Sequence, residues 1–271
     1  MLELDRPVYT AAPMTTSPAA AFRPIAPEAA GMPLYRVVKR SLLRAIEAGE
    51  CMPGETLPSE AELAAALGVS IGTLRKAVDE LVAEHLLVRR QGRGTFVATH
   101  STDRFLFQFF HVERNDGLRE PPEVDLVSFE RLRCDEEPAQ ALGLRAGDPV
   151  IQFENRLRLQ GRAVVYDRIT LSSVLFKGLT EKRLADRPGT IYQFYQSDFG
   201  ITVLRAHERA RALAADRSAA RVLGVAAGAP VMQVRRSALT FGDRPVEYRV
   251  STIDTTHHDY VNLLSRPGGP A

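Results

Sequence analysis

A repeat in the C-terminal half of the chain constrains its fold more than any other feature of the sequence. Eleven residues between positions 139 and 168 recur 81 positions later, in the same order and without a gap. A constant offset of this kind indicates a duplicated structural unit. The pairs are Ala139 and Ala220, Leu142 and Leu223, Gly143 and Gly224, Ala146 and Ala227, Gly147 and Gly228, Pro149 and Pro230, Val150 and Val231, Gln152 and Gln233, Gly161 and Gly242, Val165 and Val246, and Arg168 and Arg249.

Each copy has the pattern of a short helix, a Gly-x-Pro turn, a strand, a glycine turn and a returning strand. Together with the residues around them, the two copies predict one antiparallel sheet with helices packed on it, an α+β domain. The other expected elements are a leading strand at Phe105–Val112 with four phenylalanines, first strands of the copies at 149–159 and 230–239, helices at Leu179–Leu184 and Ile191–Asp198, and a long strand at Ile201–Leu213.

Residues 33–98 have a different pattern, that of a compact helical unit. An apolar stripe from Tyr35 to Ile46 at helical spacing predicts a first helix that stops at Gly49. Ser59 and Glu62 have the spacing of a capping box, in which each side chain binds the backbone N–H of the other residue. This box predicts a second helix that begins at Glu60.

The second and third helices of this unit are expected to form a helix-turn-helix. Gly68 closes the second helix, and Ser70 is the N-cap of the next helix after only one intervening residue. Two short strands then flank the glycine-rich turn at 91–94, which is the pattern of a wing. The N-terminal unit is therefore predicted to be a winged helix.

Charge distinguishes a DNA-binding winged helix from a merely structural one. The whole chain has 35 Lys and Arg residues against 33 Asp and Glu, a net charge of +2 that neither requires nor excludes a nucleic-acid partner. The alternative is a solvated helix face beside a structural hairpin. Cations at the start of the third helix, where this motif enters a major groove, and in the wing favour DNA. They are Arg75, Lys76, Arg89, Arg90 and Arg93.

Composition limits the remaining possibilities. No apolar run approaches the roughly 20 residues of a membrane-spanning helix, and the N-terminus lacks a secretory pattern. Cys51 and Cys134 are too few for a disulfide framework, so we expect a reduced, cytoplasmic protein. The expected organisation is a disordered Ala/Pro-rich tail at 1–32, a winged helix at 33–98, a linker at 99–104, an α+β domain at 105–265 and a tail at 266–271.

The N-terminal unit resembles the winged-helix domain of GntR-family transcription regulators. The resemblance lies in the Pro-Gly-Glu-Thr-Leu-Pro-Ser-Glu run at 53–60, in Leu67-Gly-Val-Ser70, in Thr73-Leu-Arg75 and in Gly92-Arg-Gly-Thr-Phe-Val97. It implies a homodimer on a pseudo-palindromic double-stranded DNA operator. With the cations above, the expected DNA-binding residues are Ser59, Ser70, Ile71, Thr73, Arg75, Lys76, Arg89, Arg90, Gly92, Arg93 and Gly94.

One departure from this family concerns base recognition. The family often has an arginine after the residue that opens the recognition helix, and this chain has Ile71 there, followed by Gly72. An arginine able to bind guanine through two hydrogen bonds is therefore missing at this position. We expect base recognition to shift to Thr73, Arg75 and a contact between Ile71 and a thymine methyl group.

The C-terminal domain resembles the effector-binding UTRA domain of the HutC subfamily, across about 105–265. The repeat, Thr190-Ile-Tyr192 and Pro245-Val-Glu-Tyr248 carry this resemblance. It implies a small anionic effector, a sugar phosphate or a carboxylate. In sugar-phosphate binders two arginines one residue apart on the first repeat's strand hold the anion. The positions expected to bind the effector are Arg156, Arg158, Asp167, Thr190 and Glu247, while Ile253 replaces a tyrosine of the sugar binders.

Two functions of different class remain at this stage. The favoured one is a ligand-responsive transcription regulator, a repressor released from its operator when the effector binds. The alternative is an enzyme that acts on a small carboxylate, because the UTRA fold is similar to that of chorismate lyase. No catalytic motif and no cofactor motif is found in the sequence. Adjacent strand residues point to opposite faces, so His257 and His258 are expected in an exposed loop and not as ligands of one metal ion.

Overall fold

The computed structural model describes residues 22–25 and 31–262. The chain divides into two compact units, 1–98 and 99–271, which are described separately. Most of the N-terminal tail and all of the tail predicted at 266–271 lie outside the described residues. None of the described helices is long and apolar enough to cross a membrane.

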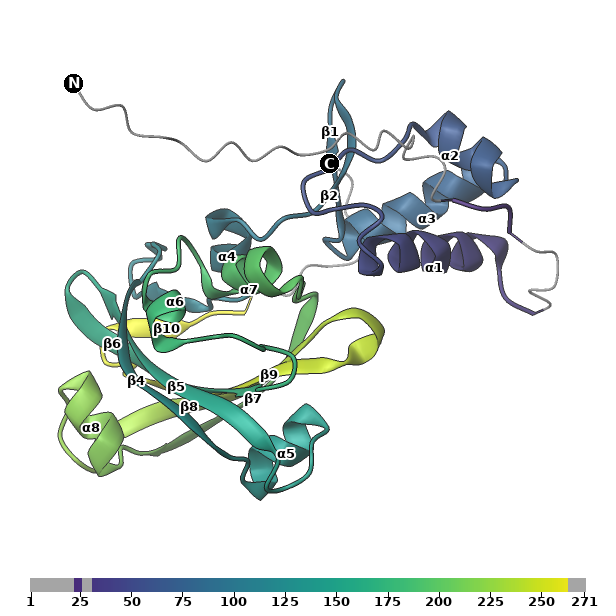
Figure 1. Ribbon diagram of the computed structural model, residues 1–271. Helices are drawn as coiled ribbons and strands as arrows, with labels where there is room; N and C mark the ends of the chain where they lie inside the picture. Colours follow the sequence, from purple (N-terminus) through teal and green to yellow (C-terminus); the bar gives the residue numbers. More distant parts are fainter. Residues whose placement is uncertain (1–21, 26–30, 263–271) are drawn as a thin grey trace, which may run out of the picture. The chain divides into compact units, whose positions relative to one another are not determined.

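In its described residues, the first unit contains three helices and a two-stranded hairpin (Figure 1). The capping box predicted at Ser59 and Glu62 is present, and Gly68 ends α2 in a left-handed conformation. The Ser70 side chain caps α3 by accepting a hydrogen bond from the Thr73 amide. The elements are α1 (Leu34–Glu47), α2 (Glu60–Leu67), α3 (Ile71–Ala83), β1 (Leu87–Arg90) and β2 (Gly94–Val97).

Residues 22–25 differ from the disorder predicted for the N-terminal tail. Phe22 is only 5% exposed, and the Ile25 amide donates a hydrogen bond to the Leu67 carbonyl at 3.0 Å. The Ala/Pro-rich composition hides this contact because one phenylalanine among small residues hardly changes the average. Burial of a phenylalanine contributes about 1.5–3 kcal/mol, enough to help order a short segment.

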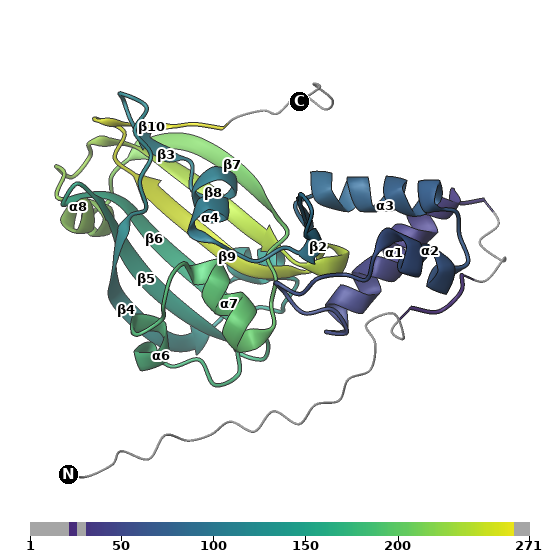
Figure 2. The same cartoon turned by 90° about the horizontal axis from the view of Figure 1, so that it is seen from above.

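The second unit is built on a six-stranded antiparallel sheet of order β4-β5-β6-β9-β8-β7. The two sequence repeats form the hairpins β5–β6 and β8–β9, which meet at the centre of the sheet, and the repeat extends to the edge strands (Figures 1 and 2). The strands are β4 (Glu123–Arg133), β5 (Pro149–Leu159), β6 (Arg162–Ser172), β7 (Arg205–Ala214), β8 (Pro230–Leu239) and β9 (Pro245–Ile253), with a 3-10 turn, η2 (Phe241–Asp243), between the last two. Strand β4 was not among the predicted elements.

Helices cover both faces of this sheet. On one face, here called the inner face, α4 (Thr102–Gln108), α6 (Glu181–Ala185) and α7 (Ile191–Phe199) lie over the main apolar core (Figure 2). On the opposite, outer face, α5 (Glu136–Leu142) and α8 (Arg217–Leu223) pack at opposite ends in two smaller clusters. A separate pair, β3 (Val112–Arg114) and β10 (His258–Tyr260), completes the unit.

The leading strand predicted at Phe105–Val112 is wrong, because the first half of this stretch belongs to helix α4 and only Val112 lies in a strand. The Ser101 side chain caps the helix by accepting a hydrogen bond from the Arg104 amide. Phe105 and Phe109, four residues apart, are both buried in the main core. The alternating phenylalanines suggested a strand, but the buried ones follow the helical period.

Candidate functional site

The start of α3 offers the polar and apolar groups expected of a recognition helix. Ser70 and Thr73 are joined through their hydroxyl oxygens at 2.9 Å, and the Ser70 oxygen also caps the helix. Ile71 is 45% exposed, which is unusual for an isoleucine and leaves its side chain available for an apolar contact. The exposed surface of this first turn therefore carries hydroxyl and aliphatic groups.

Glu60 connects the three elements that would face DNA. Its carboxylate accepts hydrogen bonds from Arg75 of α3 at 2.8 Å and from Arg89 of β1 at 3.2 Å. Arg89 also pairs with Asp79 of α3. Glu60 is the first residue of α2, so these pairs tie α2, α3 and the wing together. They also neutralise two of the cations assigned to DNA binding.

The other predicted cations differ in their surroundings. Lys76 lies over the Tyr35 ring at 4.1 Å and Arg90 over the Phe96 ring at 4.7 Å, both favourable cation–π positions. Arg93 lies exposed at the wing tip between two glycines. Gly92 has a φ of +69° and Gly94 one of +104°, and a β-carbon at Gly94 would lie only 3.3 Å from the Thr56 methyl group, so both turn positions favour glycine.

Ser59 is occupied by its capping role. Its hydroxyl accepts from the Glu62 amide at 3.3 Å and donates to the Glu62 carboxylate at 2.8 Å.

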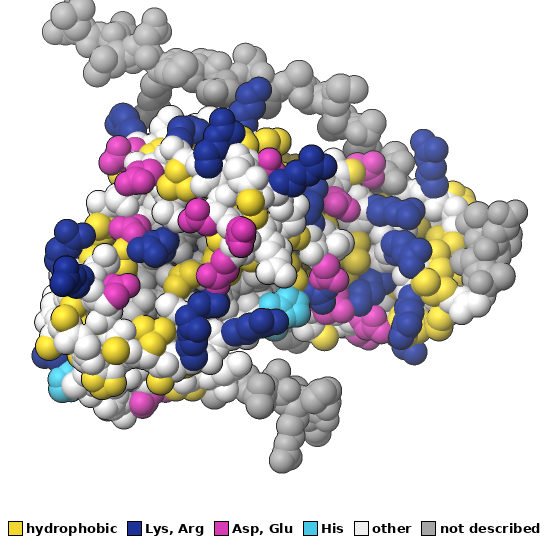
Figure 3. Space-filling model, turned by 90° about the horizontal axis from the view of Figure 1, so that it is seen from below, with side chains coloured by type: hydrophobic (Ala, Val, Ile, Leu, Met, Phe, Trp, Pro, Cys, Tyr) yellow, Lys and Arg dark blue, Asp and Glu magenta, His cyan; other side chains and the backbone are white. Residues whose placement is uncertain are grey.

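On the face of the molecule in Figure 3, Lys and Arg side chains are interspersed with Asp and Glu. The distribution agrees with the near-zero net charge and shows why composition alone carried no information about DNA.

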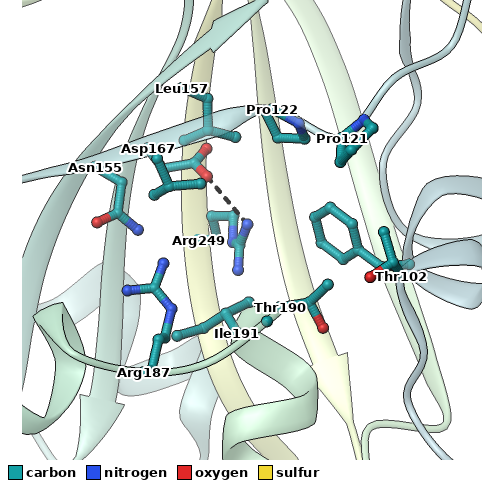
Figure 4. Close-up of a pocket in the computed structure, with 13 residues that line it drawn as sticks. Thr102, Pro121, Pro122, Asn155, Leu157, Asp167, Arg187, Thr190, Ile191 and Arg249 are labelled. Carbon is teal, nitrogen blue, oxygen red and sulfur yellow. Dashed lines mark hydrogen bonds and ion pairs between the residues drawn. The ribbon is translucent and has the colours of Figure 1, made fainter.

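A cavity of about 210 Å³ lies on the inner face of the sheet in the second unit (Figure 4). Its walls include β5 and β6 of the first repeat, β9 of the second repeat, α4 and the loop before α7. Because this volume is below the ~300–1,000 Å³ of drug-sized pockets, the cavity suits a small molecule. The lining residues are Thr102, Phe105, Pro121, Pro122, Val124, Asn155, Leu157, Asp167, Arg187, Gly189, Thr190, Ile191 and Arg249.

Arg249 occupies the floor of the cavity within a dense set of polar contacts. It binds the Glu247 carboxylate through Nε and Nη2, at 3.0 and 3.1 Å, and Asp167 through Nη1 at 3.0 Å. Burial opposes the charged form, but the two carboxylates outweigh it and raise the pKa of Arg249 well above its usual value. Arg249 is thus a fixed cation whose charge is already compensated.

Glu247 lies behind Arg249, in the core. It is completely buried and accepts hydrogen bonds from Tyr192 at 3.0 Å and from Tyr195 at 2.8 Å, both from α7. Burial, reinforced by the negative charge of Glu247, raises the pKa of Tyr192 to about 12, so that it stays a hydrogen-bond donor. Glu247 does not line the cavity, whereas Arg249, which it binds, does, so a direct effector contact of Glu247 stays a prediction.

Two other polar groups of the lining have unused hydrogen-bonding capacity. Arg187 donates from Nη1 to the Leu184 carbonyl at 2.6 Å, while its buried Nε has no partner among the described residues. Asn155 is 3% exposed, and its buried Oδ1 is also without a partner in the described part of the chain. Burial lowers the pKa of Arg187, and no carboxylate of the described residues forms an ion pair with it. Buried polar atoms of this kind normally have a partner.

Arg156 and Arg158 do not line the cavity, so an effector bound there would not touch them, and their role in holding an effector stays a prediction. Both lie on β5 and share one face, as predicted, but it is the outer face, where both pair with Asp125 of β4. The two β5 residues that do line the cavity are Asn155 and Leu157. Side chains alternate along a strand, so an error of one residue moves a pair to the opposite face.

The remaining predicted effector residues, Asp167 and Thr190, are in the lining (Figure 4). Thr190 is the N-cap of α7, and its oxygen accepts from the Gln193 amide. Sequence reasoning missed Asn155, Arg187 and Arg249. Arg249 was visible in the repeat, where it matched Arg168, but Arg168 lies on the outer face and pairs with Glu154. An isolated Arg187 in a Pro-Gly loop gave no signal of its own.

The adjacent histidines His257 and His258 differ in their exposure to solvent. His257 is exposed, as expected for a loop, but His258 is 4% exposed in β10, so the expectation of an exposed loop is wrong for His258. Its place opposite Arg114 in the short β3–β10 pair accounts for this burial. Within residues 22–25 and 31–262, no three His, Cys, Asp or Glu side chains are arranged to hold a metal ion.

Comparison with known families assigns each unit separately. Residues 34–97 match the family described as bacterial regulatory proteins, gntR family, and residues 118–259 match the UTRA domain. A solved ligand-binding domain of a putative GntR-family regulator from Bordetella bronchiseptica is 34% identical. The match covers 59% of this chain and 99% of the solved domain, with a TM-score of 0.55.

Curated relatives span both units. The HTH-type transcriptional repressor NagR of Bacillus subtilis is 29% identical over 239 residues, which is 87% of this chain and 96% of that protein. The histidine utilization repressor of Klebsiella aerogenes is 32% identical over 168 residues, or 60% of this chain and 68% of that protein.

Proposed function

Because the chain belongs to the GntR family of bacterial transcriptional regulators and carries a UTRA domain, we propose that it is a dimeric repressor that leaves its operator when a small carboxylate binds the cavity. A ligand-responsive, DNA-binding repressor agrees with its relatives, which are regulators and not enzymes. The enzyme alternative is set aside on that ground. As a DNA-binding regulator it acts in the cytoplasm.

The single observation that carries the effector assignment is the half-buried Arg187, whose buried Nε has no partner among the described residues. A guanidinium group that is partly withdrawn from water is favoured by an anion that binds it. Arg249, the other cation of the lining, is already paired with Asp167 and Glu247. Arg187 is thus the cation of the described lining without a carboxylate partner, and a single guanidinium suits the single charge of a carboxylate better than a phosphate dianion.

The other end of the effector is expected to donate hydrogen bonds. Asn155 Oδ1 is a buried acceptor without a partner among the described residues, and an N–H or O–H group of a ligand would satisfy it. The neighbouring Asp167 carboxylate already accepts from Arg249 and Ser251 and has further acceptor capacity. Between these ends, Leu157, Ile191 and Phe105 provide an apolar wall. A small metabolite with a carboxylate, a short apolar body and a distal donor fits this arrangement.

A sugar phosphate is the less favoured effector because the cavity lacks the expected arginine pair. Sugar-phosphate binders place two arginines one residue apart on the first repeat's strand, and the two β5 residues that line this cavity are Asn155 and Leu157. Neither carries a charge. The anion would then depend on Arg187, supported by the hydroxyl of Thr190 at the start of α7.

A continuous set of contacts connects the cavity to the start of the second unit. Arg249 holds Glu247, and Glu247 accepts from Tyr192. The Tyr192 ring lies 5.7 Å from that of His100, whose backbone N–H donates to Gln196 of α7 at 3.1 Å. His100 belongs to the predicted linker, 99–104. Effector binding to Asp167, which holds Arg249, would therefore act on the residues that connect the two units, with a coupling free energy of about 1–3 kcal/mol.

Two measurements test this function. The operator is first selected from a pool of randomised duplex DNA, and binding is followed by fluorescence anisotropy. Arg75→Ala should weaken binding at least tenfold with an unchanged melting temperature, consistent with loss of a base contact worth about 1–3 kcal/mol. Failure of the wild-type protein to enrich any duplex would refute the DNA-binding role.

The effector is sought by thermal shift with two matched panels, small carboxylates and sugar phosphates of similar size. A binding carboxylate should raise the melting temperature and release the selected duplex. Arg187→Gln should lose both responses and still bind DNA. Stabilisation by sugar phosphates alone would contradict the carboxylate assignment.

A further inference from the structure

The segment Phe22–Ile25 lies against the helix-turn-helix at Leu67 and Gly68. The Phe22 side chain is buried, and the Ile25 amide donates to the carbonyl of Leu67, the last residue of α2. Figure 2 shows this short purple trace beside α2. An aromatic anchor and a backbone hydrogen bond together fix the direction of the segment on the first unit.

This attachment brings the segment to the turn that precedes the recognition helix. The Pro24 side chain would lie 3.9 Å from a β-carbon at Gly68. Gly68 ends α2, and Ser70 caps α3 two residues later. The N-terminal end of α3 is the part of a helix-turn-helix that enters the major groove. Residue 23, adjacent to Pro24, therefore lies beside the end of the unit that approaches DNA.

Arg23 is an available cation at this position. It is exposed, and it forms no ion pair with a carboxylate of the described residues. By contrast, Arg75 and Arg89, two cations of the DNA-facing surface, are already paired with Glu60. The recognition helix itself has no cation in its first turn, where Ile71, Gly72 and Thr73 lie. Arg23 of the segment thus places a positive charge near the α2–α3 turn, where the first turn of α3 has none.

We propose that Phe22–Ile25 is a DNA-contacting arm, anchored by Phe22, in which Arg23 binds a backbone phosphate of the operator next to the recognition helix. The proposal rests on the DNA-binding function of the first unit. A phosphate is the expected partner because Arg23 lies beside α3 and not within it, and contacts to phosphates from such flanking positions orient a protein on the duplex.

The experiment measures operator affinity as a function of salt for the full chain and four variants. Each phosphate contact contributes about 0.9 to the slope of log K against log salt concentration. Arg23→Ala should therefore reduce the slope by about one. Between 50 and 200 mM salt, the wild type should therefore lose affinity by a factor about three to four times larger than the factor lost by Arg23→Ala. Arg23→Lys keeps the charge and should retain the wild-type slope.

Two further variants separate the arm from general effects. Phe22→Ala removes the anchor and should reduce the slope as Arg23→Ala does, even if its melting temperature is also lower. Arg217→Ala removes an exposed arginine of the second unit, with the same change in net charge, and should leave the slope unchanged.

The proposal is overturned if either Arg23→Ala or Phe22→Ala binds the operator with the wild-type salt slope. An equal loss of slope in Arg217→Ala would also overturn it, because the effect would then come from net charge alone. Failure of the wild-type chain to bind any selected duplex is a different result, which removes the DNA-binding function itself.

Discussion

Asn155 and Arg156 are neighbours in β5, and their side chains lie on opposite faces of the six-stranded sheet. The Asn155 side chain lies in the cavity under α7, whereas Arg156 binds Asp125 on the outer face. The cavity on the inner face is lined by the half-buried Arg187 and the paired Arg249. The proposed effector site therefore involves the β5 residues at 155 and 157.

This assignment predicts opposite results for two neighbouring pairs of substitutions. Asn155→Leu, which removes a buried acceptor of nearly the same size, should weaken binding of the stabilising carboxylate at least tenfold, since an unpaired ligand donor costs about 1–3 kcal/mol. The double variant Arg156→Ala, Arg158→Ala should bind the ligand as the wild type does. Isothermal titration calorimetry measures both affinities.

The double variant is the decisive control, because its effect depends only on which face of β5 binds the ligand. If it abolishes ligand binding while Asn155→Leu does not, the effector binds on the outer face and the cavity assignment is wrong. Both variants should retain operator binding, which shows that the first unit is intact.

Glu247 is expected to be a structural residue whose loss destabilises the second unit. Glu247→Gln leaves the buried Arg249 without half of its carboxylate partners. Breaking a buried ion pair in this way typically costs about 3–5 kcal/mol. Urea unfolding should show this loss, while Asp125→Asn, which affects the half-exposed pairs with Arg156 and Arg158, should cost less than about 1 kcal/mol. Equal effects of the two substitutions would contradict the central role of Glu247.

Glu60 predicts a gain of function in DNA binding. It holds Arg75 and Arg89 and adds a negative charge to the surface that would face DNA. Glu60→Gln should tighten binding to non-specific duplex DNA and steepen its salt slope by about one, because one more cation is free to neutralise a phosphate. Discrimination between the selected operator and random duplex should fall. Anisotropy titrations at several salt concentrations measure both quantities, and weaker non-specific binding would count against this view.

The fold of the first unit could be predicted almost completely because its signals are local. The Ser59 and Glu62 capping box, the left-handed Gly68 and the Ser70 cap each act within a few residues, and all three are present. The long-range features were less accessible. The segment at 22–25 is held by a hydrogen bond from Ile25 to the distant Leu67, and Phe105 belongs to a helix although the phenylalanines at 105, 107 and 109 alternate in sequence as in a strand.

The candidate site shows the same limit more sharply. The sequence identified β5 as a strand of the site but pointed Arg156 and Arg158 toward a ligand cavity, whereas both lie on the outer face. The alternation along β5 does not say which face the helices cover. Arg187 could not be recognised at all, since its importance comes from a buried Nε without a partner among the described residues. Arg249 appeared only as a repeat match, and the structure shows that Arg168, its match in sequence, lies on the outer face.

His100 predicts a specific pH dependence of stability. It is 2% exposed, and its Nε2 accepts a hydrogen bond from the Val203 amide at 3.2 Å. Burial, with the nearby charge of Arg104, lowers the pKa of His100 from 6.5 to about 3. Between these values the unfolded chain binds a proton that the folded chain does not. The free energy of unfolding should therefore fall as the pH decreases from 6.5 towards 3, by at most about 1.4 kcal/mol per pH unit from this residue.

Urea unfolding at pH 7, 6 and 5 measures this slope. His100→Gln, which cannot be protonated in this range, should remove the contribution of His100 and leave a smaller slope from other groups, including His111 and His258, whose pKa values are also lowered by burial. His257→Gln is the matched control, because His257 is exposed, and it should unfold with the wild-type pH dependence. If His100→Gln retains the full slope, the histidine is not the buried base that links α7 to the residues joining the two units.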